Sequence, residues 1–288
     1  MGAALLSLPR WCMAAWPLWA LVIGWRVPNL RPAALLLGGV GGAAAGRPEL
    51  DVAGDGPGWI VVSTNVNSYS PDADTGPLEK AIAESAPDAV IVLEKRLLAL
   101  AGFTRAADNF EDDLPRPSHG SAVFCRDGAD CVAEVTEEFG SETMKMPLAL
   151  VRLGGQVCIF GVHAPPPVPY DPSGLGPYVE SLASAIDRRR VAQAWGPCQP
   201  GDAVVVVGDL NAVPGSTAWR RLVEGEGLLD ARSATGVFGA TWPSGGGWPD
   251  LPYFRLDHLL VGDATVSGVH SRRMPGTDHK ALVFRVSP

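Results

Sequence analysis

The chain lacks an excess of positive charge, an internal repeat and, after residue 46, any long apolar run. Among its 288 residues, 23 are Lys or Arg and 31 are Asp or Glu, which gives a net charge of −8. After residue 50 the imbalance grows to 19 basic against 30 acidic side chains, a net charge of −11. This deficit disfavours tight, non-specific binding to duplex nucleic acid. It does not exclude an enzyme that acts on phosphates, because bound cations offset the charge of such a site.

Long apolar runs occur only at the N-terminus, over residues 11–25 and 32–46. Each run would form a helix of roughly 22 Å, which is shorter than the ~30 Å hydrocarbon core of a bilayer. Neither run has the polar face expected of a helix packed on a globular domain. We therefore predict that residues 1–46 associate with a membrane, that residues 47–58 form a linker rich in Gly, Pro and Asp, and that residues 59–288 form one folded domain.

Three arrangements of the N-terminal segment remain open. The first run, extended back to about residue 3, is an uncleaved anchor, or the two runs form a short hairpin in the membrane, or the first run is a signal peptide. The last interpretation is weakened because Arg10 is the only charge that precedes the run. The orientation is also open, because Arg10 flanks the run on one side and Arg26 and Arg31 flank it on the other. We expect the folded domain to lie outside the cytoplasm.

Cysteine is scarce, and the five residues are Cys12, Cys125, Cys131, Cys158 and Cys198. Cys125 and Cys131 bracket a short turn, and Cys158 and Cys198 lie near two predicted strands. Two disulfides, with Cys12 left in the membrane segment, would suit an oxidising compartment. Ordinary buried thiols explain the same positions equally well.

Strand-like segments outnumber helical ones in residues 59–288. Apolar runs and alternation predict strands at 60–64, 89–93, 119–124, 131–137, 148–153, 157–162, 204–207, 254–261 and 282–286. Helices are predicted at 77–86, 178–195 and 217–224. We expect the strand at 131–137 to pair with that at 119–124, and 148–153 to form a hairpin with 157–162. Few helices between groups of strands favour an α/β fold of two packed mixed β-sheets flanked by helices over a doubly wound parallel sheet.

The segment at residues 203–214, AVVVVGDLNAVP, combines a strand with a polar end. Its unbroken valines predict a strand buried on both faces. Asp209 and Asn211 follow two residues apart, so both point to one side if the strand continues. A carboxylate beside a carboxamide suits a hard cation or a water directed at phosphorus. A polar turn that closes a core strand explains the pair equally well.

Polar residues end other predicted strands as well. The full set is Asn65, Glu94, His163, Asp209, Asn211, Asp257, Asp278 and His279. Most have an ordinary explanation when taken singly, such as a turn cap or a buried imidazole. Asp257 needs a partner, either His258 or His279, because an isolated carboxylate in an apolar strand is costly to bury. Together, carboxylates, amides and histidines at strand ends are the groups that metal-assisted phosphoester hydrolysis uses.

The motifs STNVN, VLEK, HGSAVF, GVHAPPP, GDLNAVPGS, RLDHLLV and GTDHKAL occur in this order between about residues 60 and 286. In this order they resemble the endonuclease/exonuclease/phosphatase superfamily, and the apolar N-terminus resembles a bacterial membrane-associated branch of that group. The resemblance implies a catalytic domain over residues 59–288 that folds as a four-layer α/β sandwich. It also implies a magnesium ion as the usual cofactor, with manganese or calcium in some members.

The resemblance further implies roles for the residues that would hold metal and substrate. Glu94 would be the main metal ligand, and Asn65 beside it would hold metal or phosphate. Asp278 would be a further metal or hydrogen-bond ligand. Trp242, in the motif ATWP, resembles an aromatic substrate contact, although a Trp that fills a loop over the core is an equal alternative.

The remaining implied roles concern the reaction itself. Asp209 would orient and activate the attacking water, and Asn211 would hold a phosphate oxygen and position Asp209. His279 would stabilise the charge that develops on phosphorus, with Asp257 orienting its ring. His163 matches a histidine that many members place against the scissile phosphate. The chain departs from many members two residues earlier, where it has Gly instead of Asn.

These observations predict a magnesium-dependent phosphoester hydrolase, a phosphodiesterase or nuclease, that is monomeric and tethered to a membrane through residues 1–46. A phospholipid headgroup or an inositol phosphate is the alternative substrate, and it fits the membrane placement. A membrane-tethered module that binds a partner without hydrolysis is the alternative from another class. Because every expected metal-site position is filled, the sequence favours the enzyme.

Overall fold

In a computed structural model of the protein, the described residues are 57–66, 76–94, 99–109, 120–141, 144–166, 175–190, 194–231, 239–244 and 254–288. The predicted membrane segment at residues 1–46 and most of the linker at 47–58 lie outside these ranges, so both stay predictions. None of the helices within the described ranges has the length and apolar character needed to cross a membrane.

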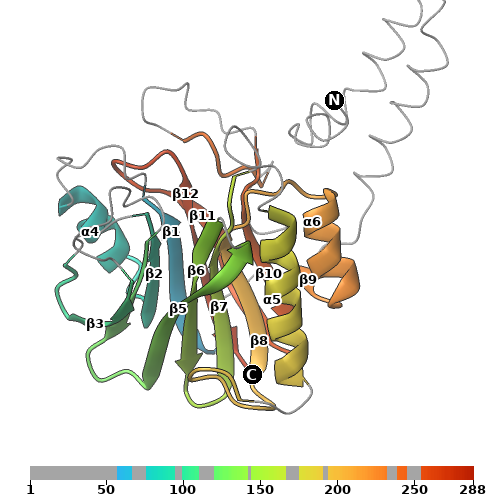
Figure 1. Ribbon diagram of the computed structural model, residues 1–288. Coiled ribbons are helices and arrows are strands. Elements are labelled where there is room, and N and C mark those ends of the chain that lie inside the picture. Colours follow the sequence, from blue (N-terminus) through green and yellow to red (C-terminus); the bar gives the residue numbers. More distant parts are fainter. Residues whose placement is uncertain are drawn as a thin grey trace, which may run out of the picture.

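Two six-stranded mixed sheets pack face to face (Figure 1). The first sheet has the order β11-β12-β1-β2-β4-β3, and the second has the order β5-β6-β7-β8-β10-β9. The strands are β1 Trp59–Asn65, β2 Ala89–Leu93, β3 Phe103–Asp108, β4 Ser121–Arg126, β5 Cys131–Ser141, β6 Met144–Leu153, β7 Val157–His163, β8 Ala203–Asp209, β9 Leu229–Asp230, β10 Asp257–Gly262, β11 Thr265–Arg273 and β12 Lys280–Ser287. Each sheet contains a parallel pair, β1 with β2 and β7 with β8. The predicted sandwich of two packed mixed sheets is therefore confirmed.

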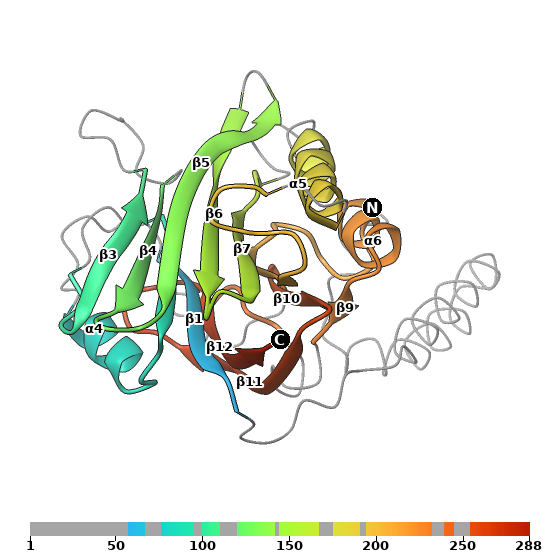
Figure 2. The same cartoon turned by 90° about the horizontal axis from the view of Figure 1, so that it is seen from below.

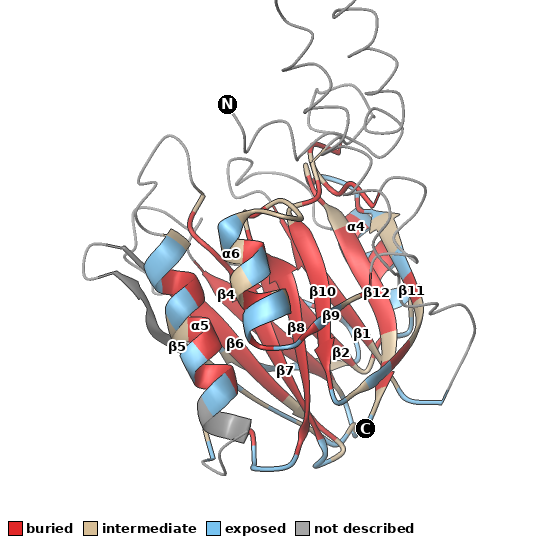
Figure 3. Cartoon of the chain, turned by 90° about the vertical axis from the view of Figure 1, so that its right-hand side faces the viewer, coloured by how far each residue is buried: buried red, intermediate tan, exposed pale blue. Residues whose placement is uncertain are grey.

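Helices cover both outer faces of the sandwich (Figure 2). Helix α4, Gly76–Ala83, packs Leu78 and Ile82 on the first sheet. Helix α5, Leu175–Arg190, packs on the second sheet beside the short helix α6, Thr217–Arg220, which continues as the π-helical turn η3, Arg221–Gly225. Figure 3 shows that α5 has a buried side toward the sheet and an exposed side toward solvent, as an amphipathic surface helix does. The described layers are thus helix, sheet, sheet and helix.

The main core lies between the two sheets. Val61 and Ile91 of the first sheet pack against Ile159 and Val205 of the second, and all four are fully buried. The apolar runs of β2 and β8 are buried along their whole length, as their unbroken β-branched sequences predict. Each such side chain contributes roughly 1.5–3 kcal/mol through burial, so this core holds the strand ends in fixed positions.

One predicted strand pairing is wrong. Residues 131–137 lie in β5, which pairs with β6 in the second sheet and not with β4 in the first. The turn at Asp127–Asp130 carries the chain from one sheet to the other. The hairpin of β6 and β7 is confirmed, and its strands are Met144–Leu153 and Val157–His163. Strand β10 corresponds to the strand predicted at 254–261, and it starts at Asp257, three residues later than predicted.

Three of the described strands were not predicted, β3, β9 and β11. All three are edge strands, and most of their side chains are exposed or only partly buried. An edge strand that is largely exposed does not need the apolar alternation by which strands are recognised in a sequence.

The described residues form two disulfides, Cys125–Cys131 and Cys158–Cys198. The first joins β4 of one sheet to β5 of the other, and the second joins β7 to the loop that precedes β8. The disulfide interpretation of these four cysteines is therefore confirmed, and Cys12 lies outside the described residues.

Candidate active site

The register of the strands gathers the predicted site residues at one end of the sandwich. Parallel pairing of β7 with β8 sets His163 opposite Asp209, and antiparallel pairing of β8 with β10 sets Asp257 on the other side of Asp209. In the first sheet, Asn65 at the end of β1 pairs with the last residue of β2, so Glu94 follows beside it. Packing of the sheets then brings Asn65 against Asp209.

Two glycines explain how closely the backbones approach beneath the site. Gly208 has φ +130°, and a Cβ there would lie 2.2 Å from the carbonyl oxygen of Val162 on β7. A Cβ on Gly161 would lie 2.9 Å from the Ile91 side chain of the facing sheet. The core thus encloses Gly161 closely, and a side chain there would force Ile91 to shift.

Asn65 links the two halves of the site across the sandwich. Its side-chain nitrogen donates to Oε1 of Glu94 and to Oδ2 of Asp209, both at 3.0 Å. These two bonds fix the side-chain nitrogen toward the two carboxylates, so Oδ1 of Asn65 points away from them. This buried oxygen has no hydrogen-bond partner among the described residues. A buried carbonyl oxygen without a partner is costly, so it indicates a place for a ligand.

Glu94 and His163 form a buried ion pair. The backbone of Glu94 has φ +66°, a left-handed conformation that is strained for a residue other than glycine, directly after β2. His163 Nε2 lies 3.1 Å from Glu94 Oε1. Burial alone would raise the pKa of Glu94 and lower that of His163, but their hydrogen bond and opposite charges reverse both. The pKa of Glu94 therefore lies below its usual value and that of His163 above it, so both are charged near neutral pH.

Asp209 and Asn211 form a tight turn after β8. The backbone N–H of Asn211 donates to Oδ1 of Asp209 at 2.8 Å, which leaves Oδ2 for Asn65. The side-chain nitrogen of Asn211 donates to the Ala164 carbonyl at 2.7 Å and so ties this turn to the end of β7. Burial raises the pKa of Asp209, although the positive His279 opposes the shift. A carboxylate with a raised pKa is a better proton acceptor.

Asp257 finds its partner in His279. His279 Nδ1 lies 2.8 Å from Asp257 Oδ2, and its Nε2 lies 3.7 Å from Asp209 Oδ2. Burial would lower the pKa of His279, but Asp257 and Asp209 outweigh it and raise the pKa to about 10. His258, the other partner that the sequence allowed, instead donates from Nε2 to the Ala212 carbonyl at 2.7 Å.

Trp242 and Asp278 complete the same end of the sandwich. Trp242 Nε1 donates to Asp278 Oδ2 at 3.1 Å, and the Trp242 ring lies 6.4 Å, centroid to centroid, from the ring of His279. Among the contacts of the described residues, Asp278 thus bonds to Trp242 and not to Glu94 or Asn65. All nine predicted residues lie in one connected set, but only two of the three predicted metal ligands touch.

Sequence reasoning missed Thr241, which holds the Asp257–His279 pair in register. Its buried hydroxyl accepts from the backbone N–H groups of Leu256, at 3.2 Å, and Asp257, at 3.1 Å. Its carbonyl accepts from the N–H of Lys280, next to His279, at 2.9 Å. The only signal in the sequence was its place directly before Trp242, which gave no reason to choose it.

Two groups of side chains could hold a divalent cation. Asp209, Asp257 and His279 offer ligand atoms within 4.8 Å of one another. His279 carries a proton at neutral pH, however, because its pKa is raised to about 10, and a protonated imidazole cannot ligate a metal. Glu94 and Asn65 fit a hard cation better, because they combine an ionised carboxylate with a buried amide oxygen that lacks a partner.

Comparisons with known proteins agree with this fold. The family model described as "Endonuclease/Exonuclease/phosphatase family" matches residues 62–279. No curated protein matches the chain. Among solved structures, the 3'-5' exonuclease NExo from Neisseria meningitidis has 16% identity and a TM-score of 0.55, over 80% of this chain and 100% of that chain.

Two further solved structures share the fold. The mannosyl-6-phosphatase Bt3783 of Bacteroides thetaiotaomicron has 13% identity and a TM-score of 0.54, over 80% of this chain and 100% of that chain. The human nocturnin catalytic domain with bound sulfate has 14% identity and a TM-score of 0.51, over 80% of this chain and 94% of that chain. At these identities the likeness shows the fold alone.

Proposed function

Because the chain belongs to the endonuclease/exonuclease/phosphatase family, whose members hydrolyse phosphoester bonds, we propose that it is a magnesium-dependent phosphodiesterase. The observation that carries the proposal is the unbroken set of contacts from Glu94 through Asn65 and Asp209 to His279 and Asp257. It supports the proposal because Asp209 could accept a proton, His279 is a buried cationic imidazole, and Glu94 and Asn65 offer a pair of oxygen ligands in the same set of contacts. A phosphate beside this set could touch all of them.

Glu94 and Asn65 would hold the cation, which supplies Lewis-acid polarisation of a phosphoryl oxygen. Asp209, held by Asn65 and by the Asn211 backbone, is oriented to accept a proton from the attacking water. Its raised pKa suits that role. His279 presents a charged Nε2 to the phosphate, and Asp257 keeps the ring protonated and oriented through Nδ1. Trp242 would contact the substrate beside His279.

A nucleic-acid phosphodiester is our proposed substrate, and a phospholipid headgroup or an inositol phosphate is the alternative. The alternative is favoured by the apolar residues 1–46, which we propose to tether the domain to a membrane. The two disulfides support an extracytoplasmic location. A non-catalytic binding module would not need the charged Asp257–His279 pair beside the carboxylate of Asp209.

A substrate panel tests the proposal. Plasmid DNA, RNA, sphingomyelin and inositol phosphates would each be incubated with the full chain, with magnesium and with excess chelator. We expect hydrolysis of at least one substrate, loss with chelator, and recovery when magnesium is restored. His279→Ala should abolish turnover, whereas His270→Ala should not, because His270 is exposed on β11. Hydrolysis that persists in excess chelator, or no hydrolysis of any phosphoester, would overturn the proposal.

A further inference from the structure

Two cations lie opposite each other where β11 ends and β12 begins, next to His279. β11 and β12 pair in antiparallel fashion, and the last pair in their register is Arg273 opposite Lys280. Lys280 directly follows His279 in the chain. Arg273 is exposed and Lys280 is partly buried. The two cations therefore lie at the site end of the first sheet.

Both side chains belong to the inner face of the first sheet. Arg272, the neighbour of Arg273, bonds to Ser85 and Glu84 just after α4, on the outer side. Because successive residues of a strand point to opposite faces, Arg273 belongs to the inner face. Lys280 lies two residues before Leu282, which packs in the core between the sheets. Asp257 and His279 also meet between the sheets at this end.

The distances suit a phosphate next to the one being cleaved. Consecutive Cα atoms are about 3.8 Å apart and paired strands about 4.8 Å apart, so both backbones lie within roughly 10 Å of that of His279. The long side chains of Arg and Lys extend further still. They can thus reach a second phosphate on a substrate whose first phosphate lies against His279.

Cβ atoms of directly opposite residues on paired strands lie about 4.5–5.5 Å apart, so one phosphate could contact both side chains. An Arg fork beside a Lys point charge is also a common way to bind a phosphate. The chain after residue 50 carries a net charge of −11 and repels polyanions, so binding one needs a local positive patch.

We propose that Arg273 and Lys280 form a second phosphate subsite, so that the preferred substrate carries at least two phosphate groups. The inference rests on the proposed function. A polynucleotide and an inositol polyphosphate share this chemistry, and they are separate arms of the test.

The test compares substrates with one and with several phosphates. Wild type, Arg273→Gln, Lys280→Gln and the double variant would be assayed on bis(p-nitrophenyl) phosphate, a single-stranded DNA oligonucleotide and an inositol polyphosphate. The matched control is Arg285→Gln, because Arg285 lies on β12 but on the opposite face, toward the other end. Melting temperatures would verify that each variant folds, and Arg273→Lys would test rescue by a conservative change.

We expect the double variant to raise KM at least tenfold on one of the two polyphosphates, with kcat within about twofold. Activity on bis(p-nitrophenyl) phosphate should not change. If the oligonucleotide is the affected substrate, the slope of log(kcat/KM) against log salt should also fall by about 0.7 for each lost phosphate contact. The affected arm identifies the source of the second phosphate.

Three results would overturn the inference. They are an equal loss on the single-phosphate substrate, no change on either polyphosphate, or a loss of the same size in Arg285→Gln. If wild type hydrolyses nothing, the proposed function fails separately, and binding of a fluorescent oligonucleotide and of inorganic pyrophosphate by wild type and double variant still decides the subsite. Equal affinity of the two proteins for both probes would then overturn it.

Discussion

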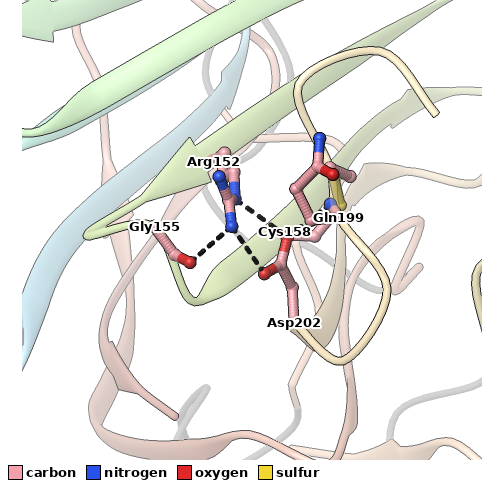
Figure 4. The surroundings of a disulfide bond; sticks show 6 residues. Arg152, Gly155, Cys158, Gln199 and Asp202 are labelled. Atoms are coloured by element: carbon pink, nitrogen blue, oxygen red, sulfur yellow. Dashed lines mark hydrogen bonds and ion pairs between the residues drawn. A yellow bond between two sulfur atoms is a disulfide. The ribbon is translucent and has the colours of Figure 1, made fainter. Parts of the chain in front are cut away.

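The two ends of the sandwich differ in how completely their buried polar groups are hydrogen-bonded. At the site end, Asn65 Oδ1 and His163 Nδ1 are buried without hydrogen-bond partners among the described residues. At the opposite end, Arg152 bonds to Asp202 and Gly155 beside the disulfide of Cys158 (Figure 4). Arg152 donates to both oxygens of Asp202, at 3.0 and 3.1 Å, and to the Gly155 carbonyl at 2.5 Å.

Asp202 also accepts from the backbone N–H of Gln199 at 2.7 Å, so its carboxylate joins β6 to the loop before β8. Cys125–Cys131 joins the two sheets at this same end, where β4 finishes and β5 begins. Disulfides thus cross-link the fold at one end. At the site end it contains buried polar atoms without hydrogen-bond partners among the described residues, which cost free energy of folding. Substitutions at the two ends should therefore separate activity from stability.

The largest effect is expected from Asp209→Asn at the site end. Removing the proton acceptor should lower kcat by about a thousandfold, within the range for a general base. The melting temperature should change by only a few degrees, because the isosteric amide keeps the turn and loses a buried charge. Steady-state kinetics and thermal unfolding measure the two quantities.

Asp202→Asn is the matched change at the opposite end. It weakens the bond to Arg152 and should cost about 1–3 kcal/mol in the free energy of unfolding while leaving kcat unchanged. If Asp209→Asn lost mainly stability, or Asp202→Asn mainly activity, the contrast between the ends would be wrong.

Next in size is the loss of the disulfides. Cys158–Cys198 spans 40 residues and Cys125–Cys131 spans 6. On the loop-entropy estimate, replacing both cysteines of a pair by Ala should cost about 4 kcal/mol for the first and about 2 kcal/mol for the second. Urea unfolding of the two double variants measures the difference, and kcat at 25 °C should match wild type in both. A larger loss from the shorter loop would contradict the estimate.

His258 lies near the site, but we expect it to affect stability and not activity, because its ring bonds to the Ala212 carbonyl. Burial, assisted by Arg255, lowers its pKa to about 4, below the 6.5 expected in the unfolded chain. The unfolded chain therefore binds a proton first as pH falls. The stability that neutral His258 supplies is complete above about pH 6.5 and is lost progressively toward pH 4, by about 3 kcal/mol.

His258→Gln keeps a donor for the Ala212 carbonyl but does not titrate. The difference in unfolding free energy between wild type and this variant should thus shrink or reverse between pH 7 and pH 4.5, as measured by urea titration. A difference that stays constant over this range would show that folding does not lower the pKa of His258.

The smallest effect is expected from Glu94→Gln, which tests the cation site. The amide keeps the bond from Asn65 but loses the charge, so the magnesium concentration for half-maximal activity should rise at least about tenfold. Glu180→Gln, on the exposed side of α5, is the control. An unchanged magnesium titration would remove Glu94 from the proposed ligands.

Much of the site could be predicted because strand ends are visible in a sequence. The apolar runs before Asp209 and before Glu94 predict buried strands. A polar residue that follows such a run must lie at the end of its strand. The residues alone could not choose the partner of Asp257, because adjacent His258 and distant His279 were both candidates, and only the family resemblance indicated His279. Thr241 could not be found either, since its role depends on hydrogen bonds to residues 15 and 16 positions away.

The sequence by itself determined which segments form the buried strands and which polar side chains end them, because burial on both faces demands unbroken apolar runs. Only the tertiary structure decided which sheet receives β5 and that Arg273 faces Lys280. These outcomes depend on pairing between distant segments, and local composition carries almost no information about the register of such pairs.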